Sequence, residues 1–131
     1  MAYLLDSDWV ISAVSGNQRV IQTLDRLSPE LLTVSWITLS EVYEGGYDSV
    51  NPEAKLEAYR DFLLSFRRLP MNDAIADQFG MLRADLRRRG NLIPDFDLMQ
   101  AALALHYDLT LLTFNRRHFQ RITDLRIYPH N

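Results

Sequence analysis

Apolar side chains recur at intervals of three and four along much of the chain, a spacing that predicts amphipathic helices. The helices are expected at residues 9–14, 18–27, 56–66, 73–90 and from 95 onward, with a short helix around Glu41 that ends at a Gly45-Gly46 turn. Residues suited to cap helices precede three of these segments, namely Ser7 or Asp8, Thr38 or Ser40, and Asn72 or Asp73.

Short apolar runs between these helices predict strands at residues 3–5, 31–36, 68–71, 109–113 and 125–128. A helix followed by a buried strand favours an α/β fold with a parallel sheet. The chain has 131 residues, of which 47% are hydrophobic. That length and composition suit one domain over residues 1–131 and leave too little chain for two.

Polar residues follow several of the predicted strands. Asp6 follows the first strand, Glu41 follows the second, and Asn115 follows the strand at 109–113. Asp95 and Asp97 lie in the first turn of the helix that begins near 95, where one carboxylate would suffice as a cap. Right-handed crossovers bring the carboxyl ends of parallel strands to one edge, so Asp6, Glu41, Asp97 and Asn115 are expected to converge.

Carboxylates packed together repel one another unless a cation lies between them, which makes a divalent metal site the natural interpretation. Mg²⁺ or Mn²⁺ fits carboxylate and amide oxygens and keeps open positions for a phosphate, chemistry that suits phosphodiester hydrolysis. Each residue also has a simpler reading: Asp6 as a helix start, Glu41 as an exposed helix acid and Asn115 as a turn residue.

Other polar residues near this group receive weaker assignments. Thr113 is expected either to hydrogen-bond a ligand carboxylate or water, or to be a buried residue at a strand end. Asp8 is expected outside the ligand set or in solvent. The histidines, His106, His118 and His130, are dispersed, and no acid is an obvious partner for any of them.

Charge is distributed unevenly. Residues 1–66 carry ten acids and four bases, whereas residues 67–131 carry seven acids and ten bases, and all but one of the 14 basic residues are arginine. Arginine suits bidentate phosphate contacts, so a candidate anion-binding surface comprises Arg83, Arg87, Arg88, Arg89, Arg116, Arg117 and Arg121, although a solvated helix face would show the same pattern.

The absence of cysteine excludes disulfides, thiolate zinc sites and a cysteine nucleophile. The first residues contain two acids, no basic stretch and no long apolar span, which argues against a signal peptide or membrane anchor. We therefore expect a cytoplasmic protein.

Three segments, YLLDSDWVIS, ITLSEVYEGGY and IPDFDLMQAALALHYDLTLLTFNRRHFQRI, together resemble the PIN-domain ribonucleases of the VapC toxin type. The resemblance covers nearly the whole chain. It implies an α/β/α sandwich on a parallel sheet, Mg²⁺-dependent endoribonuclease activity, and a toxin restrained by a cognate antitoxin. The acids of the family fall on Asp6, Glu41 and Asp97, and its fourth position falls on Asn115.

This chain departs from the family pattern at two points. Asp6-Ser7-Asp8 stands where the family often has Asp-Thr-Asn, and Asn115 stands where many members have aspartate. The loss of one charge favours one metal over two. The mechanism we expect has Asp6 and Asp97 holding Mg²⁺, Glu41 orienting or deprotonating water, and Asn115 with Thr113 positioning water or substrate.

Two other functions compete with this one. The Leu4-Leu5-Asp6-Ser7-Asp8 segment resembles the first motif of haloacid-dehalogenase phosphotransferases, but the only lysine, Lys55, lies on a helix away from any strand end. The other alternative is a PIN fold that binds RNA or a partner without cutting it. The resemblance also implies a homodimer and an antitoxin groove, for which the exposed sides of helices 41–47 and 56–66 are candidates unless their apolar residues belong to the core.

Overall fold

The computed structural model describes residues 2–129 and contains one sheet of five parallel strands, in the order β3-β2-β1-β4-β5. Because β1 lies in the middle, the chain runs outward to β3 on one side and then returns to β4, directly beside β1. This arrangement confirms the parallel α/β fold. The strands are β1 (Ala2–Leu5), β2 (Leu32–Val34), β3 (Arg67–Arg68), β4 (Leu109–Leu112) and β5 (Arg126–Ile127).

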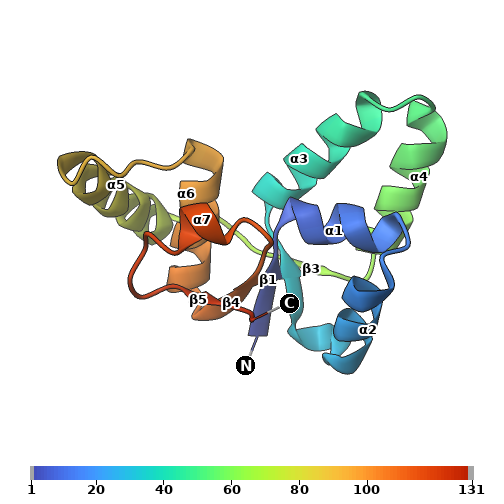
Figure 1. Cartoon of the computed structure of the whole chain (residues 1–131), viewed down its shortest axis with the longest axis horizontal. Coiled ribbons are helices and arrows are strands. Elements are labelled where there is room, and N and C mark those ends of the chain that lie inside the picture. Colours follow the sequence, from blue (N-terminus) through green and yellow to red (C-terminus); the bar gives the residue numbers. More distant parts are fainter. Residues whose placement is uncertain (1, 130–131) are drawn as a thin grey trace.

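Helices cover both faces of the sheet, as Figure 1 shows, so the expected three-layer sandwich is confirmed. One face packs against α1 (Ser7–Val14), α2 (Gln18–Arg26), α3 (Trp36–Tyr47) and α4 (Pro52–Leu63). The other face packs against α5 (Asp73–Arg88), α6 (Asp95–His106) and the short α7 (Arg116–Phe119).

Alternation along the central strands builds a separate core on each face. Leu4 and Leu111 belong to the cluster beneath α5 and α6, whereas Leu5 and Leu112 belong to the cluster beneath α1 to α4. Neighbouring side chains of a strand point to opposite faces, so two adjacent leucines serve two cores. Because helices cover both faces of the sheet, all four residues of β4 are buried, and three of them are leucine.

The helix starts differ from the predicted ones. Asp6 caps α1 by accepting the backbone N–H of Ser7, and Ser35 caps α3 by accepting the N–H of Thr38. The prediction of Asn72 or Asp73 is confirmed in favour of Asn72, which accepts the N–H of Ile75. Asp6 and Ser35 directly follow β1 and β2, so α1 is capped at least one residue earlier than predicted and α3 at least three residues earlier.

The predicted Gly45-Gly46 turn is wrong, because α3 continues through both glycines to Tyr47. Gly46 is buried, and a Cβ there would lie 2.6 Å from Leu56 Cδ2, so this glycine permits close packing of α3 on α4. Gly45 has open space around it. The pair therefore combines one glycine needed for a helix crossing with one that the fold tolerates.

Several predicted strands are shorter in the structure. The predicted strand 31–36 retains only β2, because Pro29–Leu31 forms a 3-10 turn before it and α3 begins immediately after Ser35. Helix α7 was not predicted, since its four residues are too few to show a periodic pattern. Within residues 2–129 no helix combines the length and apolar character required to span a membrane.

Candidate active site

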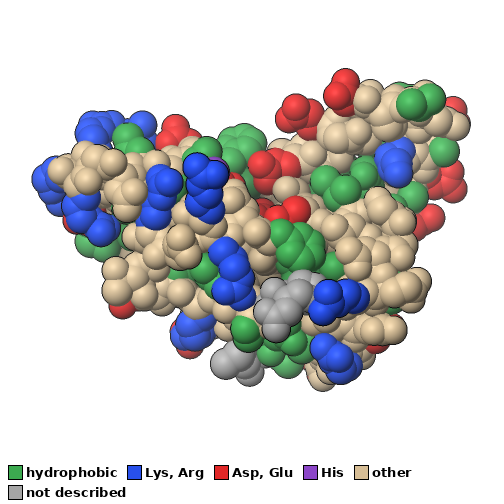
Figure 2. Space-filling view, in the orientation of Figure 1, with side chains coloured by type: hydrophobic (Ala, Val, Ile, Leu, Met, Phe, Trp, Pro, Cys, Tyr) green, Lys and Arg blue, Asp and Glu red, His purple; other side chains and the backbone are tan. Residues whose placement is uncertain are grey.

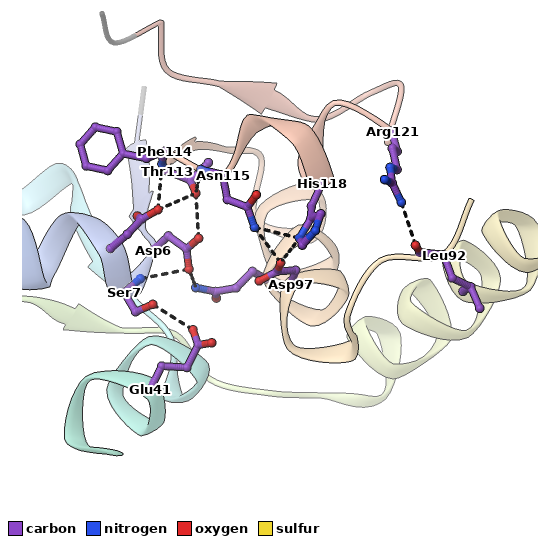
Figure 3. Close-up of polar contacts among 12 residues, drawn as sticks. Asp6, Ser7, Glu41, Leu92, Asp97, Thr113, Phe114, Asn115, His118 and Arg121 are labelled. Atoms are coloured by element: carbon purple, nitrogen blue, oxygen red, sulfur yellow. Dashed lines mark hydrogen bonds and ion pairs between the residues drawn. The ribbon is translucent and has the colours of Figure 1, made fainter. Parts of the chain in front are cut away.

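The candidate site lies where the strand order reverses, between the carboxyl ends of β1 and β4. The backbone N–H of Asp6 donates to the carbonyl of Leu112 at 2.9 Å, which joins the two strand ends directly. Residues that immediately follow β4, including Thr113 and Asn115, therefore come to the same edge as Asp6 (Figure 3). Such a reversal point is where α/β sheets usually bind ligands.

Asp6 is the most enclosed carboxylate of the site, with 4% of its surface exposed. Its Oδ1 accepts from the Ser7 N–H at 3.0 Å and from Gln100 Nε2 at 3.2 Å, while its Oδ2 accepts from Thr113 Oγ1 at 2.8 Å. Burial raises the pKa of Asp6 above its ordinary value, and the charge of Asp97 adds to this, although the three hydrogen bonds act in the opposite direction. The expectation that Thr113 bonds a site carboxylate is confirmed.

Asp97 projects from the first turn of α6 and meets two side chains from the segment after β4. Its Oδ2 accepts from Asn115 Nδ2 at 3.1 Å and lies 2.7 Å from His118 Nδ1. His118 Nδ1 also lies 2.8 Å from Asn115 Nδ2, so Asp97, Asn115 and His118 form one contact group. The prediction that no histidine has an obvious acid partner is therefore wrong for His118. His130 lies outside the described residues.

Glu41 reaches the site from the second turn of α3. Its Oε1 accepts from Ser7 Oγ at 3.1 Å, which ties α3 to the start of α1. Partial burial raises the pKa of Glu41, and the nearby charges of Asp6 and Asp97 raise it further. The structure thus brings together all four residues that the sequence nominated, Asp6, Glu41, Asp97 and Asn115.

Asp8 also lies beside this group, so the alternative that placed it in solvent is wrong. Its Oδ2 accepts from the Phe114 N–H at 3.0 Å, and its Oδ1 is buried without a hydrogen-bond partner among residues 2–129. Burial and the neighbouring charge of Asp6 raise the pKa of Asp8 to about 7. Asp8 therefore adds to the negative charge that the site must neutralise.

Gln100 hydrogen-bonds residues of the elements that carry the site, and it was not predicted from the sequence. It is fully buried, accepts from Ser35 Oγ at 2.5 Å, and donates through Nε2 to Thr38 Oγ1 at 2.8 Å and to Asp6 at 3.2 Å. These contacts connect α6 with α3 and β1. A glutamine on the alanine-rich packing face of α6 could have indicated this network, because a buried amide requires polar partners.

Asp95 lies apart from the carboxylate group. Its Oδ1 pairs with Arg83 Nε at 2.9 Å, which links the start of α6 to α5 at the surface. Pro94, and not Asp95, occupies the cap position, and no side chain caps α6. Asp95 is therefore not the cap of α6, but as an acid in its first turn it remains a partner of the helix dipole, and it also pairs with Arg83 at the surface.

The donor set suits a hard divalent cation. Burial raises the pKa values of Asp6 and Glu41, and the charges of neighbouring carboxylates raise both further, while the buried Oδ1 of Asp8 has no hydrogen-bond partner among residues 2–129. In the described part of the chain, no three carboxylate or imidazole side chains are close enough to enclose an ion by themselves. Mg²⁺ usually takes one or two carboxylates together with water and substrate phosphates, so Asp6 and Asp97 meet its requirement.

Figure 2 shows how charge is arranged around the site. Acidic side chains lie in the recess between the α1–α4 half and the α5–α7 half, and basic side chains gather over α5 and α7. Two of the predicted arginines are tied to backbone carbonyls, Arg116 to Tyr128 and Arg121 to Leu92. A polyanion lying across the α5–α7 half would thus meet arginines before it reached the acids.

Residues 3–125 match the model of the PIN domain, and the chain belongs to this family. A ribonuclease VapC2 of Haemophilus influenzae is 33% identical over 128 residues, covering 96% of each chain. A tRNA(fMet)-specific endonuclease VapC of Salmonella typhimurium is 29% identical over 127 residues, covering 97% of this chain and 96% of the relative.

Solved structures agree with this assignment. VapBC2 from Rickettsia felis, bound to a DNA fragment from its promoter, superposes with a TM-score of 0.91 at 25% identity, and the match covers 100% of both chains. DNA-bound VapBC from Salmonella typhimurium gives a TM-score of 0.89 at 29% identity over 98% of this chain and 97% of that one. The likeness extends over the sheet and both helical layers.

Proposed function

We propose that this protein is a metal-dependent endoribonuclease that acts as the toxin of a toxin-antitoxin pair. The observation that carries the proposal is the meeting of Asp6, Glu41 and Asp97 at the β1–β4 edge, in a chain of the PIN family. Relatives that are named ribonuclease or endonuclease, and that match over nearly the whole chain, support the choice of RNA as substrate.

Asp6 and Asp97 would hold the cation. Asp6 is presented by β1 and oriented by Gln100 and Thr113, while the hydrogen bonds from Asn115 and His118 fix the rotamer of Asp97. PIN-domain nucleases generally use divalent metals, and Mg²⁺ or Mn²⁺ suits these oxygen donors. When bound, such an ion would polarise a phosphoryl oxygen and acidify water.

Glu41 is the residue we assign to accept a proton from the attacking water. Ser7 occupies Oε1, so the other carboxylate oxygen is available to the water. Its elevated pKa brings Glu41 closer to neutrality, where a general base is more effective. Asn115, through the amide that it directs at Asp97, would help to position water or substrate next to the cation.

The arginines of α5 and α7 are the proposed binding surface for the RNA backbone. Their guanidinium groups match phosphate geometry, and their position beside the recess complements the acids within it. The mixture of signs explains how a chain of net charge −3 would bind a polyanion. Binding by this surface should weaken steeply as salt concentration rises.

The toxin assignment includes two protein partners. The solved VapBC assemblies of Rickettsia felis and Salmonella typhimurium support a cognate antitoxin, for which the outer surfaces of α3 and α4 remain the candidate groove. A homodimer is proposed from the same resemblance. Light scattering of the purified chain, with and without the product of an adjacent gene, would test both proposals.

The decisive experiment is cleavage of a mixed RNA pool by the purified protein, with Mg²⁺, with Mn²⁺ and with EDTA. The Asp6→Asn and Asp97→Asn variants should lose cleavage, whereas Asp25→Asn, an exposed acid on α2, should retain it. Loss of activity in EDTA and in both site variants would support the proposal. Metal-independent cleavage, or unchanged cleavage by Asp97→Asn, would refute it.

The alternative function is a PIN-fold module that binds RNA or a partner without cutting. Two observations favour it: Asn115 supplies an amide and no charge, and the described residues contain no group of three metal-ligand side chains. Binding of RNA without cleavage under every metal condition would support this alternative. Cleavage that Asp97→Asn abolishes would exclude it.

A further inference from the structure

Two exposed aromatic rings stand beside the candidate active site. Trp36 begins α3 and Phe96 lies in the first turn of α6, with 43% and 44% of their surfaces exposed. Their ring centroids are 6.1 Å apart at an interplanar angle of 80°, so the rings meet edge to face across the two helix starts. In this geometry, the ring that contributes its edge has neither face covered by the other ring.

Both rings are joined to the acid group by the backbone. Phe96 directly precedes Asp97, so their Cα atoms are about 3.8 Å apart. Trp36 directly follows Ser35, whose hydroxyl bonds Gln100, which in turn bonds Asp6. A ligand that contacts Phe96 would therefore lie one residue from Asp97, and the edge-to-face contact places Trp36 beside Phe96.

Polar contacts hold the two ring-bearing segments in place. On one side of Phe96, Asp95 pairs with Arg83 of α5, and on the other side Asp97 is bonded by Asn115. The segment before Trp36 is held by Ser35. The ring pair is thus a preorganised surface, and ordering it on binding would cost little conformational entropy.

We propose that Trp36 and Phe96 form a seat on which an unpaired base of the RNA stacks while the adjacent phosphate reaches Asp6 and Asp97. This inference rests on the proposed function and deepens it, since it assigns a single-stranded substrate and names the residues that recognise it. Proteins that bind single strands commonly place aromatic rings beside a charged channel for this purpose. Stacking also supplies an uncharged attraction, which is useful where carboxylates repel phosphate.

Stacking on Phe114 is a less favourable choice, although this ring is also exposed at the same edge. Its face lies against Trp9, with centroids 5.2 Å apart and planes inclined by 16°. That stacked contact uses one face of Phe114. The edge-to-face pair of Trp36 and Phe96 leaves more aromatic surface available to a base.

The chain offers a direct optical test, because it contains two tryptophans, of which Trp9 is fully buried and Trp36 is exposed. Emission would be recorded while a 12-nucleotide single-stranded RNA is added, with Ca²⁺ in place of Mg²⁺ and strand integrity checked on a gel. The RNA should quench the wild type and leave Trp36→Phe, which retains Trp9, unchanged. An abasic strand of the same length should not quench.

Binding and turnover extend this test. Phe96→Ala should weaken binding of the RNA by about tenfold and raise KM with little change in kcat, whereas Phe96→Tyr should stay within about twofold of the wild type. Met71→Ala provides the control, because Met71 is an exposed apolar residue next to Pro70, whose carbonyl accepts from Tyr107 at the opposite end of α6 from Phe96. Thermal unfolding of each variant verifies that it is folded.

The outcomes separate this inference from the proposed function. Quenching without cleavage in Mg²⁺ would support the stacking seat and refute the nuclease. Cleavage with neither quenching nor a change in KM for Phe96→Ala would refute the seat and leave the nuclease intact. Equal quenching by the abasic strand would also refute the stacking seat. Conversion of a dimer to monomers by Phe96→Ala would refute it as well, since the rings would then contact a second copy of the chain.

Discussion

Replacing Gln100 by methionine tests whether one buried amide holds the candidate site together. Methionine preserves the length of the side chain but removes three hydrogen bonds, to Ser35, Thr38 and Asp6. A typical hydrogen bond contributes about 1 kcal/mol and one to a charged group about 1.5–3 kcal/mol. The hydroxyl oxygens of Ser35 and Thr38 lie 3.4 Å apart and can still hydrogen-bond to each other in the variant. We therefore expect a loss of about 3 kcal/mol in the free energy of unfolding.

The assay is thermal and urea unfolding of the whole chain. For a domain of this size, about 3 kcal/mol corresponds to a decrease of roughly 10 °C in Tm. The pKa of Asp6 should also rise, because the bond from Gln100 lowers it. Metal-dependent cleavage should therefore require higher pH in the variant than in the wild type.

A matched control is Gln22→Met, the same substitution at an exposed position of α2. It should change the free energy of unfolding by less than about 0.5 kcal/mol. If Gln100→Met matched the stability of this control, the buried network would not stabilise the fold and the reasoning would be refuted. If Gln100→Met lost the expected free energy of unfolding but cleaved RNA with the pH dependence of the wild type, only the link to Asp6 would be refuted.

Three other predictions address the site and the helix crossing. Asp8→Asn should stabilise the metal-free protein at pH 8 by about 2 kcal/mol and have little effect at pH 4. Folding raises the pKa of Asp8 from 3.8 to about 7, so the folded wild type loses stability as pH rises through that interval. Partial exposure of Asp8 to solvent reduces the full effect by about half. Asn115→Asp should lower Tm without metal, since it places a second carboxylate beside Asp97, and should increase the rise in Tm on adding Mn²⁺. Gly46→Ala should destabilise the fold by about 1 kcal/mol, because its Cβ would collide with Leu56, whereas Gly45→Ala should stabilise it by about 0.5–1 kcal/mol.

Each of these predictions has a contrary result. Equal stability differences for Asp8→Asn at pH 4 and pH 8 would show that its carboxylate titrates normally. An identical Mn²⁺ response of Asn115→Asp and wild type would place residue 115 outside the cation's reach. If Gly45→Ala and Gly46→Ala changed urea unfolding equally, steric contact with Leu56 would not explain the glycine at 46.

Local patterning was sufficient for most of the architecture. The apolar residues Leu109, Leu111 and Leu112 and the helix before them predicted a buried strand in a parallel sheet, because strands of such sheets are covered on both faces. The positions of Asp6 and Asn115 after their strands then predicted one edge of the sheet as the site. This reasoning works because parallel strands connected by right-handed crossovers have little topological freedom.

Tertiary structure decided the features that depend on long-range contacts. His118 has no acid near it in sequence, yet α7 brings it to Asp97, 21 residues away. Gln100 bonds residues 62, 65 and 94 positions away, and Asp8, whose burial raises its pKa to about 7, accepts from the N–H of Phe114, 106 residues away. The sequence by itself therefore determined the fold class and the acids that meet, since these follow from local periodicity and chain topology. Packing alone determined which side chains orient those acids and how strongly their charges interact, because desolvation and hydrogen bonding exist only between surfaces that the folded chain brings together.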